Sequence, residues 1–136
     1  MTLDAWRGPA ATKWTGMALI AVVGIIHLIE MPEHFEEAAY LGLLFLANGA
    51  GAAAAAAGIA RDARWGWLLG VAVASGAFMA YVWSRAVGLP GLDADEAEWL
   101  EPLGLTSLVA EVLFVALAVT VLTGRGAPAP RRASAA

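Results

Sequence analysis

Four apolar runs, each about 20 residues long, occupy most of the chain and leave few folds open to it. A run of this length is what an α-helix needs to cross the hydrocarbon layer of a bilayer. Inside lipid the backbone groups must be hydrogen-bonded within the segment, so each run is expected to be helical. We therefore predict an all-α, integral membrane four-helix bundle of up-down topology, formed as a single domain by residues 1–123. The expected spans are 14–31, 38–60, 65–87 and 103–123.

Composition agrees with a membrane protein. Of the 136 residues, 60% are apolar and 15% are charged, whereas soluble domains average about 45–50% and about 25%. The chain has no cysteine, which excludes disulfides, thiolate metal sites and cysteine nucleophiles. Residues 124–136 are basic and rich in proline and alanine, and we expect this tail to be disordered because it has little to pack.

The distribution of basic residues predicts the orientation. All but Arg85 of the eight basic residues lie before the first run, between the second and third runs, or after the fourth run. By the positive-inside rule both termini are then cytoplasmic, and the other two connections face outward. The basic residues on the expected inner side are Arg7, Lys13, Arg61, Arg64, Arg125, Arg131 and Arg132.

Two segments suggest a source for the chain. His-Leu-Ile-Glu-Met-Pro-Glu-His at 27–34 and Ser-Arg-Ala-Val-Gly-Leu-Pro-Gly at 84–91, in an Ala/Gly/Arg-rich chain, resemble segments of four-span proteins of GC-rich bacteria. That resemblance implies the inner (cytoplasmic) membrane of a bacterium and assigns no activity.

The connection after the first run is the most polar stretch near the membrane, and it holds both histidines. His27, Glu30, His34 and Glu37 are spaced i, i+3, i+7 and i+10, which places them on one face of a continuous helix. Pro32 interrupts this pattern, because proline suits the first turn of a new helix. Either a tight hairpin at residues 31–32 or a kinked helical segment is compatible with this sequence.

Polar side chains within the spans gather in the expected outer half. An ionisable group inside a membrane segment costs about 2.5–3.5 kcal/mol on insertion scales, so such groups usually face the bundle interior and have partners. His27 is expected about 6 Å below the outer end of its helix, and Glu111 about 12 Å below that of the fourth. The other members of this group are Asn48, Tyr81, Ser84 and Arg85.

One hypothesis is a metal site. Imidazole and carboxylate together suit zinc, iron or copper(II), and a mononuclear site would use His27, Glu30, His34 and Glu111. Glu37, Asn48, Tyr81 and Arg85 would support it. The pattern differs from the di-metal four-helix proteins, in which Glu-x-x-His motifs come from two helices. Haem is not favoured, because both histidines come from one segment.

Three other hypotheses stay open. In a structural polar network, His27 would bond to Glu111, Asn48 or Tyr81, and Glu111 would pair with Arg85. The chain would otherwise be a non-catalytic accessory subunit of a larger membrane complex, or an enzyme using His27 and Glu111 as an acid/base pair on a lipid-like substrate.

Small residues predict close helix contacts. Gly49 and Ala53 in the second run, with Gly66 and Gly70 in the third, are spaced four apart, which lets helix backbones approach in lipid. We expect the second and third helices to meet there, or such faces to form a homo- or hetero-oligomer. The expected partner is the lipid bilayer; no feature of the chain indicates nucleic acid.

The orientation is testable because the native chain has no cysteine. A cysteine replacing Asp95 should react with a membrane-impermeant thiol reagent applied to intact cells, because the residue lies in an expected outer connection. A cysteine replacing Ala63 should react only after the membrane is opened. The reverse pattern would overturn the predicted orientation.

Overall fold

The chain folds into helices in the four places where the apolar runs predict them. The computed structural model describes residues 9–94 and 99–124. Its helices are α1 (Ala10–Glu37), α2 (Ala39–Ala60), α3 (Arg64–Ala86) and α4 (Pro102–Leu122). Each is long and apolar enough to cross a membrane. At about 1.5 Å per residue, α1 is about 42 Å long and the others about 31–35 Å.

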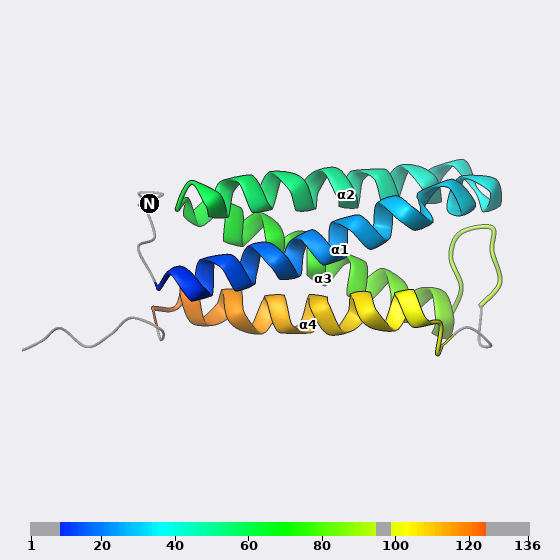
Figure 1. The fold of residues 1–136 in the computed structure, drawn as a ribbon. Helices are drawn as coiled ribbons and strands as arrows, with labels where there is room; N and C mark the ends of the chain where they lie inside the picture. The colour runs from blue at the N-terminus through cyan, green and yellow to red at the C-terminus, as the bar shows by residue number, and fades with distance from the viewer. Residues whose placement is uncertain (1–8, 95–98, 125–136) are drawn as a thin grey trace, which may run out of the picture.

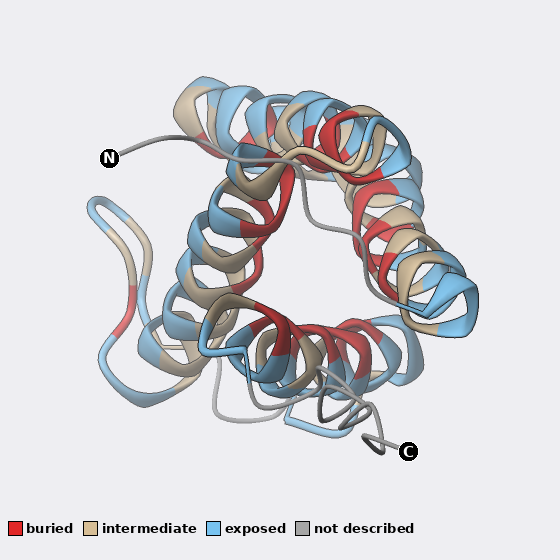
Figure 2. Cartoon of the chain, turned by 90° about the vertical axis from the view of Figure 1, so that its left-hand side faces the viewer, coloured by how far each residue is buried: buried red, intermediate tan, exposed pale blue. Residues whose placement is uncertain are grey.

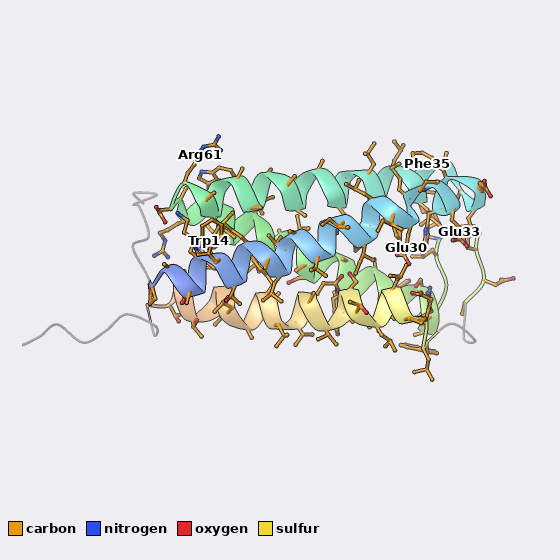
Figure 3. All side chains as sticks on the ribbon, in the orientation of Figure 1. Trp14, Glu30, Glu33, Phe35 and Arg61 are labelled. Atoms are coloured by element: carbon orange, nitrogen blue, oxygen red, sulfur yellow. The ribbon has the colours of Figure 1, made fainter. Side chains whose placement is uncertain are left out.

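The four helices lie side by side, and consecutive helices run in opposite directions (Figure 1). Neighbours in the chain pack together and α1 also packs against α4, while α1 and α3 lie across from each other with few contacts. Viewed along the helices, buried residues line the inward side of this ring (Figure 2). We call the end with Trp14 and Arg61 the basic end and the end with Glu33 and Phe35 the acidic end (Figure 3).

The first helix does not stop at its proline. Pro32 lies inside α1, which ends at Glu37, so the hairpin considered at residues 31–32 is not formed. The chain reverses instead at Ala38, a single extended residue whose N–H donates to the His34 carbonyl at 3.1 Å. The Phe35 ring lies against Gly42 of α2, where a Cβ would collide with it. The turn can be short because Gly42 has no side chain and so leaves room for the Phe35 ring.

Large apolar side chains fill the core in the basic half of the ring. The rings of Trp67 in α3 and Phe114 in α4 stack with centroids 5.8 Å apart and 17° between their planes. Together with Ile20, Val23 and Ile59 they have no exposed surface, and we call these five residues the apolar plug. Gly16 of α1 lies against the Trp67 ring and Gly70 against the Phe114 ring, and any side chain there would overlap the aromatic atoms.

The contact between α2 and α3 is built on glycine, although not on all the predicted residues. A Cβ on Gly58 would lie 2.7 Å from the Cα of Gly66, so the two backbones touch. The expectation for Gly66 is therefore confirmed. The other three expectations are wrong: Gly49 faces Leu28 of α1, Gly70 faces Phe114 of α4, and Ala53 is exposed. Small residues allow a close approach but do not specify which helix approaches.

Polar contacts fix the helix ends. The Glu101 carboxylate caps α4 by accepting the N–H groups of Leu103, at 2.8 Å, and Gly104. At the basic end the Lys13 ammonium pairs with the Asp62 carboxylate at 2.9 Å, which ties the start of α1 to the α2–α3 turn. Of the expected tail at 124–136, residues 125–136 lie outside the described residues, as do positions 95–98.

The packing around the plug predicts a large difference between two glycines of α3. Gly70→Leu should destabilise the protein by about 1–3 kcal/mol, because the new side chain overpacks the Phe114 ring. Gly76→Leu is the matched control, because Gly76 is exposed and a Cβ there would meet nothing within 4 Å. Thermal unfolding in detergent measures both variants. Equal melting temperatures for Gly70→Leu and the wild type would contradict the assigned contact.

Candidate functional site

The interior changes from apolar to polar one helical turn beyond the plug. The inward stripe of α4 is buried along its whole length, and its residues recur every three or four positions. From the basic end the stripe consists of Val121, Ala118, Phe114, Glu111, Ser107 and Gly104. Glu111 therefore lies next to the plug, on its acidic-end side.

Glu111 is the most buried ionisable group among the described residues. Only 2% of its surface is exposed. Its Oε1 accepts a hydrogen bond from the Ser107 hydroxyl at 2.8 Å, and its Oε2 is buried with no hydrogen-bond partner among the described residues. Buried polar atoms are nearly always satisfied in native proteins. The Glu111 Oε2 is therefore an exception to this rule among the described residues.

Two further lone pairs lie on other helices. The Asn48 amide of α2 donates from Nδ2 to the Val73 carbonyl of α3 at 3.4 Å, while its buried Oδ1 has no partner in the described part of the chain. The His27 Nδ1 lies 2.9 Å from the Val23 carbonyl. A carbonyl can only accept, so Nδ1 carries the hydrogen and Nε2 of the neutral ring keeps a lone pair.

These three residues lie at one level of the structure. Because α1 continues to Glu37, His27 is ten residues from the acidic end of its helix, not about four as expected from the sequence. Asn48 and Glu111 are each nine residues from the acidic ends of α2 and α4. At about 1.5 Å per residue all three lie about 13–15 Å below that end.

Phe45 separates the two histidines. Its ring centroid is 4.9 Å from that of His27 and 3.8 Å from that of His34. Two residues seven apart on a helix are offset by about 10.5 Å along its axis, so the Phe45 ring must lie between the imidazoles. The Nδ1 of His34 is also held, 3.0 Å from the Glu30 carbonyl. One ion therefore cannot bind both rings in this arrangement, because zinc–nitrogen bonds are only about 2.0–2.1 Å long.

Charged groups gather at the acidic end. Glu30 lies within electrostatic range of His34, Arg85 and Glu101, which come from α1, α3 and the cap of α4. In Figure 3 its side chain points from α1 toward α3 and α4. The Arg85 guanidinium lies 4.6 Å from the centroid of the Tyr81 ring and donates to the Ser84 hydroxyl at 3.1 Å. Glu37 is exposed at the end of α1.

The predicted metal ligands are not brought together as one set. Within residues 9–94 and 99–124, no three His, Cys, Asp or Glu side chains form a group that would hold a metal ion. The expected polar network also has other partners: Glu111 bonds to Ser107, and the His27 Nδ1 contacts its own helix. Sequence reasoning missed Ser107, although its position four residues before Glu111 is the spacing of side chains that meet on a helix. Nothing in the sequence indicated Phe45.

Comparison of the chain with models of known protein families, with curated proteins and with solved structures finds no match.

The ring geometry predicts the tautomer of both histidines. At a pH where the imidazoles are neutral, His27 and His34 should carry hydrogen on Nδ1 and a lone pair on Nε2, because each Nδ1 faces a backbone carbonyl. Long-range proton–nitrogen NMR of protein labelled with ¹⁵N-histidine measures this. The variant His34→Gln assigns the two signals, and an Nε2–H tautomer for His27 would contradict the assigned contact.

Proposed function

We propose that this protein is an up-down four-helix membrane bundle, with both termini cytoplasmic, that binds a small cation on the Glu111 carboxylate. The observation that carries the proposal is the buried Glu111 Oε2, which has no hydrogen-bond partner among the described residues. Ionisable groups inside membrane proteins usually face the interior and mark ion or proton sites. The acidic end is then the outer end, as the basic residues Lys13, Arg61 and Arg64 at the other end indicate.

Polar groups at the same level favour a cation over any other ligand. The Glu111 Oε2 and the Asn48 Oδ1 are buried without a hydrogen-bond partner among the described residues. The His27 Nε2 of the neutral ring also has a lone pair, because its Nδ1 faces the Val23 carbonyl. A hydrogen-bond-donating or positively charged species satisfies such atoms, whereas an anion would be repelled by the carboxylate. Ser107 stabilises the carboxylate through its hydroxyl.

Two cations fit this chemistry. A proton needs only the carboxylate. A divalent transition metal such as zinc, iron or copper accepts imidazole and carboxylate ligands; it would use Glu111 and His27, because Phe45 keeps His34 from sharing the ion with His27. Glu30 and His34 would then belong to the entrance of the site and not to its ligands.

The other hypotheses remain predictions. An accessory subunit would use the row of exposed small residues on α2, which includes Ala47, Ala50 and Ala54. An acid/base enzyme would use the His27 Nε2 together with Glu111 on a lipid-like substrate. The bacterial inner membrane is the setting that we propose for all three.

The proposal predicts a selective chemical modification. Dicyclohexylcarbodiimide, an apolar reagent, reacts with carboxyl groups that carry a proton in apolar surroundings. It should label the protein at Glu111, as read by mass spectrometry of peptides, and the label should be absent from Glu111→Gln. Glu36→Gln is the control and should label normally, because Glu36 is exposed on α1.

Added cations identify the ligand in the same assay. If a metal is bound, zinc, iron or copper salts should protect Glu111 from the reagent, and elemental analysis should find a stoichiometric metal that is lost in His27→Ala and Glu111→Gln. If the ligand is a proton, only raising the pH should protect Glu111. A protein that neither labels at Glu111 nor holds a metal would leave the carboxylate in a structural network and overturn the proposal.

A further inference from the structure

Glu111 is covered along its own helix in both directions. One turn toward the basic end, Phe114 has no exposed surface, and one turn toward the acidic end, Ser107 is 5% exposed. Beyond Ser107 the stripe continues with Gly104, which is buried against the Tyr81 ring of α3. Glu111 itself is 2% exposed, and its Oε2 is buried. Water therefore does not reach this carboxyl group in the packed bundle.

The surroundings of the Glu111 Oε2 leave room for a proton and not for a metal ion. Because this oxygen is buried, no water molecule fits against it, so an ion that keeps part of its water shell does not fit either. A dehydrated metal ion must take its ligands from the protein, and zinc almost always takes four in structural sites. In the described part of the chain no three His, Cys, Asp or Glu side chains form a group that could supply them. A proton needs neither the space nor the set of ligands.

No charged group in the described ranges balances an ionised Glu111. Arg85 acts electrostatically on Glu30, whereas Glu111 is influenced by its own burial and by the neutral hydroxyl of Ser107. The neutral His27 ring offers a lone pair and no positive charge. The partly buried titratable side chains that α1 and α3, the two helices packed against α4, contribute to the acidic half are His27, Glu30, His34, Tyr81 and Arg85.

Burial then decides the charge state of Glu111. An isolated ionised carboxylate costs far more to bury than a neutral polar group that lacks a hydrogen bond, so a buried carboxyl group takes up a proton instead. The hydrocarbon around the bundle adds to the cost of the charged form. The Ser107 hydroxyl donates to Oε1, which is therefore the carbonyl oxygen of the neutral group, and Oε2 carries the proton.

We propose that the ligand of Glu111 is a proton, carried on Oε2, and that the packed bundle shields this neutral carboxyl group from water on both sides of the membrane. This inference rests on the proposed function and names its ligand. The proton can then enter or leave only when the packing around α4 opens. The aromatic stack is part of that packing, because Phe114 lies one turn from Glu111 and its ring lies against Gly70.

Infrared spectroscopy of the full chain in vesicles detects the proton. The C=O stretch of a neutral carboxyl group absorbs at a higher frequency than the stretches of an ionised carboxylate. At neutral pH we expect a neutral-carboxyl band that is missing from Glu111→Gln. Glu36→Gln is the matched control and should keep the band, because Glu36 is exposed on α1.

The rate of hydrogen–deuterium exchange measures the shielding. Heavy water shifts the band when deuterium replaces the proton, and a shielded group exchanges only during local opening. We expect the shift to lag behind the exchange of amides outside the helices, and to be about tenfold faster in Gly70→Leu, which overpacks the Phe114 ring. Gly76→Leu should exchange like the wild type, because a Cβ there would meet nothing within 4 Å. Phe114→Leu replaces Gly70→Leu if that variant does not fold.

The two proposals fail differently. If Glu111→Gln removes no neutral-carboxyl band, the proton is the wrong ligand. A stoichiometric metal that is lost in the same variant would then leave the cation site standing, whereas a protein without that metal would overturn the cation site as well. If the band is present but shifts as fast as the amides outside the helices exchange, Glu111 holds a proton and the shielding is wrong.

Discussion

The stack of Trp67 on Phe114 holds the bundle together at its centre. Helices in lipid gain no hydrophobic free energy from meeting each other, because the lipid tails are as apolar as their side chains, so close packing must supply the attraction. Two aromatic rings fit between the helices only because Gly16 and Gly70 provide the space. The stack thereby joins α1, α3 and α4. The backbone contact between Gly58 and Gly66 packs α2 against α3.

The same packing explains where polar groups are tolerated. The plug fills the basic half, so an ionisable group there would have neither water nor space. The inward stripe becomes polar directly beyond it, at Glu111 on α4 and His27 on α1. The apolar plug thus ends where the proposed cation site begins. A change that loosens the aromatic stack would alter the surroundings of Glu111 as well as the stability of the fold.

The sequence was sufficient for the helices and insufficient for their contacts. Length and apolarity located all four helices, because the bilayer imposes both properties. The end of α1 was not predicted. Pro32 is typical of a break in a helix, but α1 continues through it and the chain turns at Ala38 instead. Gly66 was assigned to the right neighbour and Gly70 to the wrong one, because a small residue encodes the distance of approach and not the identity of the partner.

The candidate site was predictable to a similar degree. The expectation that Glu111 faces inward follows from the cost of a charge in lipid, and the structure buries that residue. Its hydrogen bond with Ser107 could have been predicted from the spacing of four residues on a helix. The separation of His27 from His34 by Phe45 was not, because it depends on the register of α2 against α1, which only the packed structure contains.

The length of α1 has a consequence for the membrane around it. At about 42 Å this helix exceeds the hydrocarbon thickness of about 30 Å by more than its neighbours do. A helix with such mismatch tilts or extends beyond the bilayer. In Figure 1, α1 runs obliquely, close to α4 at the basic end and to α2 at the acidic end. A thicker bilayer would favour a more upright α1, so the lipid composition of the membrane would affect how closely α1 packs against α4 at one end and α2 at the other.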